Sequence, residues 1–519
     1  MTAARRLLLV GALALPCATA RAEPRPTEGG LWSFDGDDVV EHWDEPTGVV
    51  RVHYSVAGRN QTRLLDDDGD LVPDFPQQVA QTTAQALSIF ADELLLRPPV
   101  SEATLGLELL GGSPALDVYL VDFGGASDGR FGVDGCTEGG PRHCVGFLVI
   151  ENDFVGYGYG SLQEAVEVVA VHEAFHAVQA AYGTLPIWMS EGMAVWGQRQ
   201  FAPQWPDFLH WCNAYLAAPG RPLDEPPPGP VPAFAYGTAL WWDYLGERHD
   251  PVVMGEVLLA METADGSEAD GMAAVVEALQ GRSDGLTAAF GEFARANLAT
   301  GARAGRATTH AYAAQLEPIV ASEEGWPLEV DARVYGVATE YWRIDHPGGP
   351  LWLGADAPLP GVELSLHAVQ DGAPDGVVED PLALETVEAQ GVIAMAGGAA
   401  LPAGGYWLVV ARPVEASSSA RARVCVGDEV HAAGCAPDEG TTGALDDTGA
   451  LDSSTGEPPG DESSEGGTQQ GTDATSDGMA VGEGQGCSCR ARAAGERVPL
   501  SWLAWSMVVL GLRSSRRRW

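Results

Sequence analysis

The chain has 519 residues, of which 73 are acidic and 29 basic, so its formal net charge is −44. The length allows two or three domains of roughly 150 residues, and a hydrophobic content of 45 % is enough to form a substantial core. The acidic excess argues against nucleic acid and anionic membrane surfaces as partners, because both repel a negatively charged protein.

The first 22 residues, MTAARRLLLVGALALPCATARA, predict a secretory signal peptide cleaved after Ala22. A basic start is followed by an apolar run and a small-residue end. A mature membrane anchor is the weaker alternative, because about ten apolar residues cannot cross roughly 30 Å of hydrocarbon. A lipoprotein cut before Cys17 is disfavoured by Leu15 and Pro16, which replace the usual small residues.

Hydrophobic periodicity outlines the first 300 residues. The alternation in VVRVHYSVAG predicts one or two strands within residues 30–60, and helical spacing predicts a helix over residues 77–95. LDVYLVDF (116–123) and VGFLVI (145–150) are expected to be short strands. Helices are expected at residues 161–182, 187–200, 206–216 and 236–248, with further helical runs to about residue 304.

An aspartate-rich segment, LLDDDGDLVPDF, precedes the first expected helix. It places four carboxylates around Gly69, those of Asp66, Asp68, Asp70 and Asp74. Alternating aspartates with a glycine for the turn resemble loops that bind calcium through oxygen ligands. The alternative is a solvated acidic turn.

Residues 172–176 form an H-E-x-x-H motif, His172-Glu173-Ala174-Phe175-His176. Residues four apart share one face of a helix, so both imidazoles can bind one zinc ion, and Glu173 can take a proton from a metal-bound water. Two surface histidines are the alternative, but apolar residues surround this helix on all sides. Burial of unpaired ionisable groups is costly, so the motif predicts a metal site.

The next segment, WMSEGMA (188–194), points to the third ligand. It resembles the W-x-x-E-G-x-A helix of gluzincin metallopeptidases, whereas Gln179 and Tyr182 exclude the metzincin pattern. The resemblance implies that His172, His176 and Glu191 bind zinc and that Glu173 is the general base. His210 and Asp207 remain competing third ligands.

Hydrolysis also requires a group that stabilises the oxyanion. The segment PAFAYGTALWWDYLGERHD is expected to start a helix at Tyr236, where gluzincins commonly place such a group. Tyr236 is therefore the candidate and His249 the second, the alternative being a tyrosine of the aromatic core. In zincins an edge strand pairs with the substrate, and residues 116–123 or 145–150 are expected to supply it.

The cysteines fit an exported protein. Cys136 and Cys144 flank one short loop and Cys425 and Cys435 another, so each pair is expected to form a local disulfide. Cys212 is expected to be a buried thiol and not a nucleophile.

The C-terminal part changes character twice. Residues 325–435 contain short strands with Gly/Pro turns, which favour a small antiparallel β-sandwich, whereas residues 436–486 have the composition of a disordered acidic stalk.

In residues 487–519, Cys487 and Cys489 precede a short apolar segment and terminal arginines. This tail resembles the MYXO-CTERM sorting signal, which implies contact with sorting machinery and membrane and display on the cell surface; an ordinary tail anchor is the alternative.

The sequence thus predicts an α+β protein with a zincin-like domain (23–320), built of a mixed sheet and active-site helices, before the β-sandwich. The expected function is that of an exported, cell-surface zinc metalloendopeptidase acting on proteins or peptides. An adhesin or binding protein with an inactive zincin scaffold is the main alternative, and a metal-dependent hydrolase of other substrates is a third.

Overall fold

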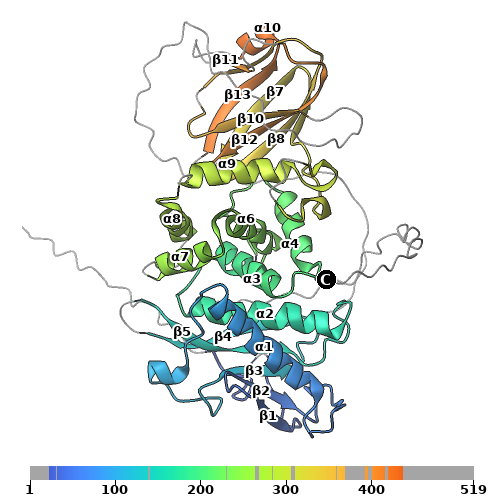
Figure 1. Ribbon diagram of the computed structural model, residues 1–519, viewed down its shortest axis with the longest axis vertical. Coiled ribbons are helices and arrows are strands. Elements are labelled where there is room, and N and C mark those ends of the chain that lie inside the picture. The colour runs from blue at the N-terminus through green and yellow to red at the C-terminus, as the bar shows by residue number, and fades with distance from the viewer. Residues whose placement is uncertain are drawn as a thin grey trace, which may run out of the picture.

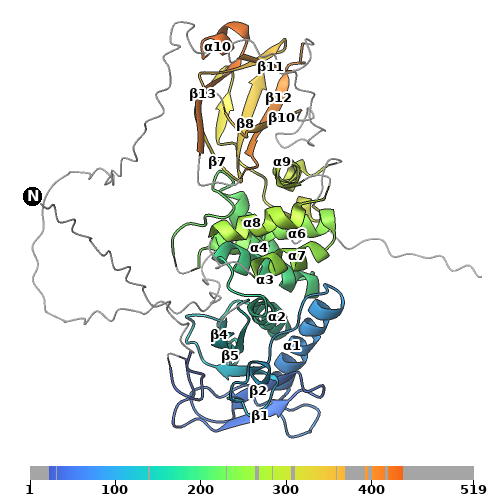
Figure 2. The ribbon, with the colours of Figure 1, turned by 90° about the vertical axis from the view of Figure 1, so that its left-hand side faces the viewer.

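The computed structural model describes residues 23–30, 32–137, 141–229, 231–262, 268–282, 285–305, 310–357, 359–368, 392–395, 400–414 and 419–435. The predicted signal peptide, stalk and sorting tail lie outside these ranges. The described part is mixed α and β, as expected, and is elongated, with a sheet at one end, helices in the middle and further strands at the other end (Figures 1 and 2).

A five-stranded mixed sheet forms the N-terminal end, in the order β1-β2-β3-β5-β4. β2, β3 and β5 run parallel, and β1 and β4 lie antiparallel at the two edges. The strands are β1 (Val40–Asp44), β2 (Val50–Ser55), β3 (Leu116–Val121), β4 (Gly129–Cys136) and β5 (Cys144–Glu151).

Two helices, α1 (Asp74–Asp92) and α2 (Leu162–Ala180), cover one face of this sheet and pack against each other. On the opposite face, Trp32 and Phe34 pack on buried aromatic and aliphatic side chains of β3 and β5. Arg25 is 1 % exposed and forms ion pairs of 2.6 Å with Asp117 and Asp134. Residues close to the predicted cleavage site are therefore part of the folded core.

The middle of the molecule is helical (Figure 1). Its helices are α3 (Ile187–Phe201), α4 (Asp207–Leu216), α5 (Ala233–Gly237), α6 (Ala239–His249), α7 (Val252–Met261), α8 (Glu268–Leu279) and α9 (Gly285–Leu298). Short 3-10 helices occur at η1 (Glu102–Leu105), η2 (Gly301–Arg303) and η3 (Ala313–Gln315). Within the described residues, no helix combines the length and hydropathy needed to cross a membrane.

The C-terminal strands form two four-stranded sheets, β10-β12-β8-β6 and β11-β9-β13-β7, whose apolar side chains share one buried cluster. The strands are β6 (Glu323–Gly325), β7 (Leu328–Tyr335), β8 (Ala338–His346), β9 (Leu351–Ala355), β10 (Glu363–Ala368), β11 (Val392–Met395), β12 (Gly404–Arg412) and β13 (Ser419–Gly427), followed by α10 (Glu429–Ala433). All named pairs are antiparallel except β6 with β8, which departs from the all-antiparallel expectation.

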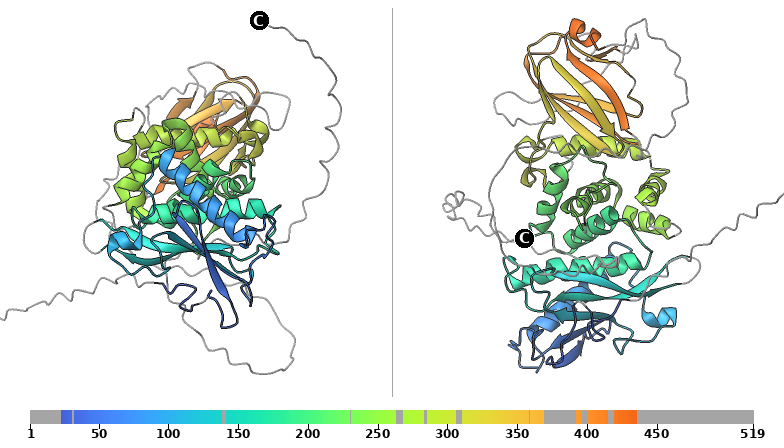
Figure 3. Two further views of the ribbon diagram at one scale, coloured as in Figure 1. Left: turned by 60° about the horizontal axis from the view of Figure 1, so that its bottom comes forward. Right: turned by 180° about the vertical axis from the view of Figure 1, so that it is seen from behind.

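The C-terminal sheets rest on the helical layer through α9, which lies between them and the remaining helices (Figure 3). The hydroxyl of Tyr341 on β8 donates a 2.8 Å hydrogen bond to the carbonyl of Ala294 on α9. Tyr341 is 1 % exposed and belongs to the large core cluster of the N-terminal part. The contact joins the two parts through buried surface.

Both expected disulfides are present. Cys136–Cys144 joins the edge strand β4 to β5, and Cys425–Cys435 joins β13 to the segment after α10. Cys212 is a buried free cysteine, as expected, and burial raises its pKa well above the ordinary value.

Candidate metal centre

The helix that carries the H-E-x-x-H motif, α2, begins with a capping arrangement. The hydroxyl of Ser161 accepts a 3.0 Å hydrogen bond from the N–H of Glu164, and the Glu164 carboxylate accepts one of 2.8 Å from the N–H of Gly160. These contacts satisfy amides that a helix start leaves unpaired. The helix ends at Ala180, shortly before Gly183, whose φ is +145°.

The following helix, α3, returns past α2 and brings Glu191 to the motif. Gly192 allows close approach on the other side of α3, because an added Cβ would lie 2.1 Å from Oγ1 of Thr238 and 2.9 Å from Trp242. Glu191 is thus the candidate ligand of α3, and any side chain at the next residue, Gly192, would push α5 and α6 away from this helix.

Three donor atoms from these helices converge. Nε2 of His172 lies 3.1 Å from Nε2 of His176 and 3.2 Å from Oε2 of Glu191, and the third distance, from His176 to Glu191, is 3.6 Å. Donors around a tetrahedral zinc ion, each about 2.0–2.1 Å from it, are about 3.3–3.4 Å apart. The observed spacing fits that donor set.

The electrostatics of the cluster also favour a cation. Burial alone would lower the pKa of His176, but the Glu191 carboxylate raises it to about 9, while burial lowers the pKa of His172. Burial opposes ionisation of Glu191, yet the two imidazoles hold its pKa well below the ordinary value. Oε1 of Glu191 is buried without a hydrogen-bond partner. In the protein alone a proton on His176 must balance this carboxylate, and a divalent ion would supply that charge.

The edge strand β4 begins directly over Glu173. An added Cβ on Gly129 would lie 2.8 Å from Oε1 of Glu173 and 2.6 Å from Cγ1 of Val169. Only a glycine lets the strand lie this close to the motif helix. The expectation that residues 116–123 or 145–150 supply the sheet edge was wrong, because β3 and β5 are interior strands and β4 lies outside β5.

Tyr236 lies on the His172 side of the cluster. Its ring centroid is 5.7 Å from that of His172, and Trp211 stacks on it at 4.5 Å. Tyr236 belongs to the short helix α5, three residues after its start, so the expectation that a helix begins at Tyr236 was wrong. Proximity keeps Tyr236 as the candidate oxyanion stabiliser.

The other candidates from the sequence lie outside the three-residue group. Asp207 accepts hydrogen bonds from Gln198 (3.1 Å) and from the indole of Trp211 (2.9 Å), whereas His210 is exposed and its ring lies 5.1 Å from that of Trp211. His249 is the last residue of α6, and its carbonyl accepts a hydrogen bond from Arg282.

The cluster is almost closed to solvent. His172 and His176 are each 3 % exposed, and Glu173 and Glu191 are 0 % exposed. Any molecule that reaches these donor atoms must therefore enter through local opening of the surrounding elements. The sequence did not show this closure, because burial depends on how α3, α5 and β4 pack around α2.

The aspartate-rich loop is a separate feature. The carboxylates of Asp66, Asp68 and Asp74 offer ligand atoms within 4.8 Å of one another. Asp70 is not part of this group, and its carboxylate accepts hydrogen bonds of 2.8 Å from the N–H of Val72 and from Gln77. A calcium site here stays a prediction from the sequence.

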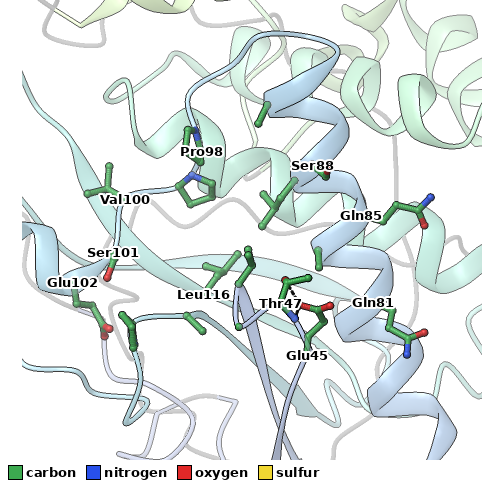
Figure 4. A pocket seen from close by; sticks show the side chains of 18 of the residues that line it. Glu45, Thr47, Gln81, Gln85, Ser88, Pro98, Val100, Ser101, Glu102 and Leu116 are labelled. Carbon is green, nitrogen blue, oxygen red and sulfur yellow. Dashed lines mark hydrogen bonds between the residues drawn. The ribbon is translucent and has the colours of Figure 1, made fainter.

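A cavity of about 730 Å³ lies elsewhere, between α1 and the segments around residues 47, 98 and 115. Figure 4 shows Gln81, Gln85 and Ser88 on α1 across from Pro98 and Leu116. Its lining shares no residue with the metal cluster, so the two features are independent.

Sequence reasoning missed one polar side chain at the centre. Gln179 accepts from Nδ1 of His176 at 2.8 Å and donates to the carbonyl of Ser190 at 2.9 Å. The sequence signal for it was a polar residue three positions after His176 in an otherwise apolar helix.

Comparison with protein-family models found no match to the chain, and comparison with curated protein sequences found none either.

Proposed function

We propose that this protein is an exported, zinc-dependent metallopeptidase of gluzincin type. The observation that carries the proposal is the convergence of two imidazole nitrogens and one carboxylate oxygen at 3.1–3.6 Å. The mixed sheet with α1 and α2 on one face is consistent with a zincin-like domain, and the two C-terminal sheets around one core are consistent with a β-sandwich.

Each residue of the centre has a proposed role. His172, His176 and Glu191 would hold the ion, which when bound supplies a Lewis acid that activates water and polarises a carbonyl. Glu173 would take the proton of the attacking water and later deliver it to the leaving amine. Tyr236 would donate a hydrogen bond to the developing oxyanion, and β4 would pair with the extended substrate.

The cellular setting is part of the same proposal. The predicted signal peptide and the two disulfides suit an oxidising compartment outside the cytoplasm. The acidic stalk and the sorting tail would then display the folded part at the cell surface.

The burial of the centre favours a second candidate function. An ion enclosed by His172, His176 and Glu191 could serve only to hold α2 and α3 together, in an adhesin or binding protein without peptidase activity. Structural zinc sites usually have four protein ligands, whereas the three donors found here leave one position open, as in catalytic sites, so the burial alone supports this second function.

One experiment separates the two functions. Full-length protein is expected to contain about one zinc per chain and to cleave a generic protein substrate until a chelator is added. Glu173→Gln is expected to keep the zinc while cleavage falls by about 10²–10⁴-fold. Zinc in both forms with cleavage by neither would establish the binding protein, and absence of zinc from both would reject the metal site.

A further inference from the structure

The side chain of Gln179 connects the two helices that carry the proposed ligands. Its Oε1 lies 2.8 Å from Nδ1 of His176, and its Nε2 donates a 2.9 Å hydrogen bond to the carbonyl oxygen of Ser190. Ser190 directly precedes Glu191, and its hydroxyl lies 3.3 Å from the same Oε1. Gln179 is 3 % exposed, so these contacts form away from bulk water.

The two contacts determine the orientation of the amide. A carbonyl oxygen only accepts, so the NH₂ group of Gln179 must face Ser190 and Oε1 must face His176. Because Oε1 also only accepts, His176 carries a proton on Nδ1. In the neutral ring, Nε2 then presents its lone pair toward His172, whose Nε2 is 3.1 Å away.

The same amide acts on the position of the third ligand. The hydrogen bond to Ser190 ties α2 to α3 at the residue before Glu191. Oε2 of Glu191 lies 3.2 Å from one imidazole and 3.6 Å from the other, so a small shift of α3 would change both distances. Metal ligands must be held within about 0.5 Å of the productive geometry.

We infer that Gln179 is a positioning residue for the metal centre: it keeps His176 in the tautomer that binds through Nε2 and holds α3 where Glu191 completes the ligand set. The inference rests on the proposed metal site but not on peptidase activity, because its direct consequence is metal affinity. Mutation of the hydrogen-bond partner of the ring nitrogen that does not bind the metal typically lowers metal affinity by about 10–100-fold.

The test measures zinc affinity of the full-length protein by competition with a chromophoric chelator, and repeats the measurement with Co²⁺, whose visible absorption reports ligand geometry. Gln198→Ala is the matched control, because Gln198 lies on α3, is also 3 % exposed and donates a 3.1 Å hydrogen bond to Asp207. Gln179→Ala is expected to bind zinc about 10–100-fold more weakly, with an altered Co²⁺ spectrum. Gln198→Ala is expected to change the affinity by less than about threefold, since it touches no ligand.

Gln179→Glu distinguishes positioning from packing. It keeps an acceptor for His176 but loses the donor to Ser190, so it is expected to recover part of the affinity lost in Gln179→Ala. Equal losses in the Gln179→Ala and Gln198→Ala proteins, or no recovery in Gln179→Glu, would overturn the inference. If Gln179→Ala does not fold, ¹⁵N NMR of His176 in the zinc-loaded wild-type protein decides: a proton on Nδ1 supports the inference, and a proton on Nε2 with zinc bound through Nδ1 overturns it.

The outcome is independent of the peptidase test. A protein whose zinc affinity depends on Gln179 in this way but which cleaves no substrate would retain the inference and reject the proposed enzyme. A wild-type protein that binds no zinc would reject both.

Discussion

Nε2 of His172 lies 3.2 Å from Oε2 of Glu191, although the two residues are 19 positions apart and belong to different helices. The contact exists because α3 turns back along α2 after Gly183. Two imidazoles and a carboxylate then face one another in a region with almost no access to water. Burial of these ionisable side chains costs free energy unless another charge compensates them. The contact between His172 and Glu191 is therefore a main support for the metal proposal.

The first prediction concerns the third ligand. Glu191→Ala removes one of three donors, so bound zinc after dialysis is expected to fall from about one per chain to near zero. Asp207→Asn is the comparison variant, because Asp207 contacts Gln198 and Trp211 and not the donor group. Metal analysis of both proteins checks the assignment. Full zinc in Glu191→Ala together with loss in Asp207→Asn would move the third ligand to α4.

The second prediction concerns Tyr236. Tyr236→Phe keeps the ring against His172 and Trp211 but removes the hydroxyl, so zinc content is expected to stay unchanged. Removal of one oxyanion donor typically lowers kcat by about 10²–10³-fold. Steady-state kinetics on a peptide substrate measure the change. An unaltered kcat would make Tyr236 an aromatic packing residue only.

The local part of this site could be predicted from the sequence. The four-residue spacing of His172 and His176 requires only helical geometry, and α2 spans both residues as expected. Glu191 could be nominated only through a resemblance, because its distance from the histidines depends on how α2 and α3 cross. Helix crossing is a tertiary property that periodicity does not encode.

The edge strand β4 shows where sequence patterns fail. Gly129, Gly132 and Gly135 interrupt its apolar alternation, and glycine is depleted in strands, so the sequence predicts no strand over residues 129–136. Tertiary packing explains these glycines. An added Cβ on Gly132 would lie 2.5 Å from the Phe147 ring, and one on Gly129 would meet Glu173. The glycines that interrupt the strand pattern in the sequence are the residues that allow β4 to pack closely at the site.

The third prediction follows from that close approach. Gly129→Ala places a Cβ where Glu173 and Val169 now lie, so Glu173 must move or β4 must shift. Because the three proposed ligands are untouched, zinc content is expected to stay near wild type while cleavage falls, and overpacking is expected to lower stability by about 1–3 kcal/mol.

Gly135→Ala is the control on the same strand, since its Cβ would meet only the side-chain tip of Leu107, at 3.2 Å. Peptidase assays, metal analysis and thermal melts of the two variants provide the comparison. Equal activity in both proteins would show that the start of β4 does not constrain the general base.

The fourth prediction concerns Glu151, which ends β5 and is not a member of the metal group. Burial raises the pKa of Glu151 to about 7, although Tyr157 (2.6 Å) and the N–H of Phe123 (3.0 Å) both donate to its Oε2. Between pH 4.5, the ordinary pKa, and pH 7 the folded state keeps a proton that the unfolded chain has lost. Unfolding then releases a proton, so this group makes stability fall as pH rises through that window.

Glu151→Gln removes this pH dependence while keeping an oxygen for both donors. Relative to wild type, the variant is expected to gain about 3 kcal/mol between pH 4.5 and pH 8, a rise of several degrees in melting temperature. Glu329→Gln, at an ion pair with Arg423 that is about half exposed, is expected to show no such trend. Thermal melts of the three proteins across this pH range measure the difference. A constant offset between Glu151→Gln and wild type at every pH would mean that Glu151 has the same pKa in the folded and unfolded states, because its two hydrogen bonds balance the cost of burial.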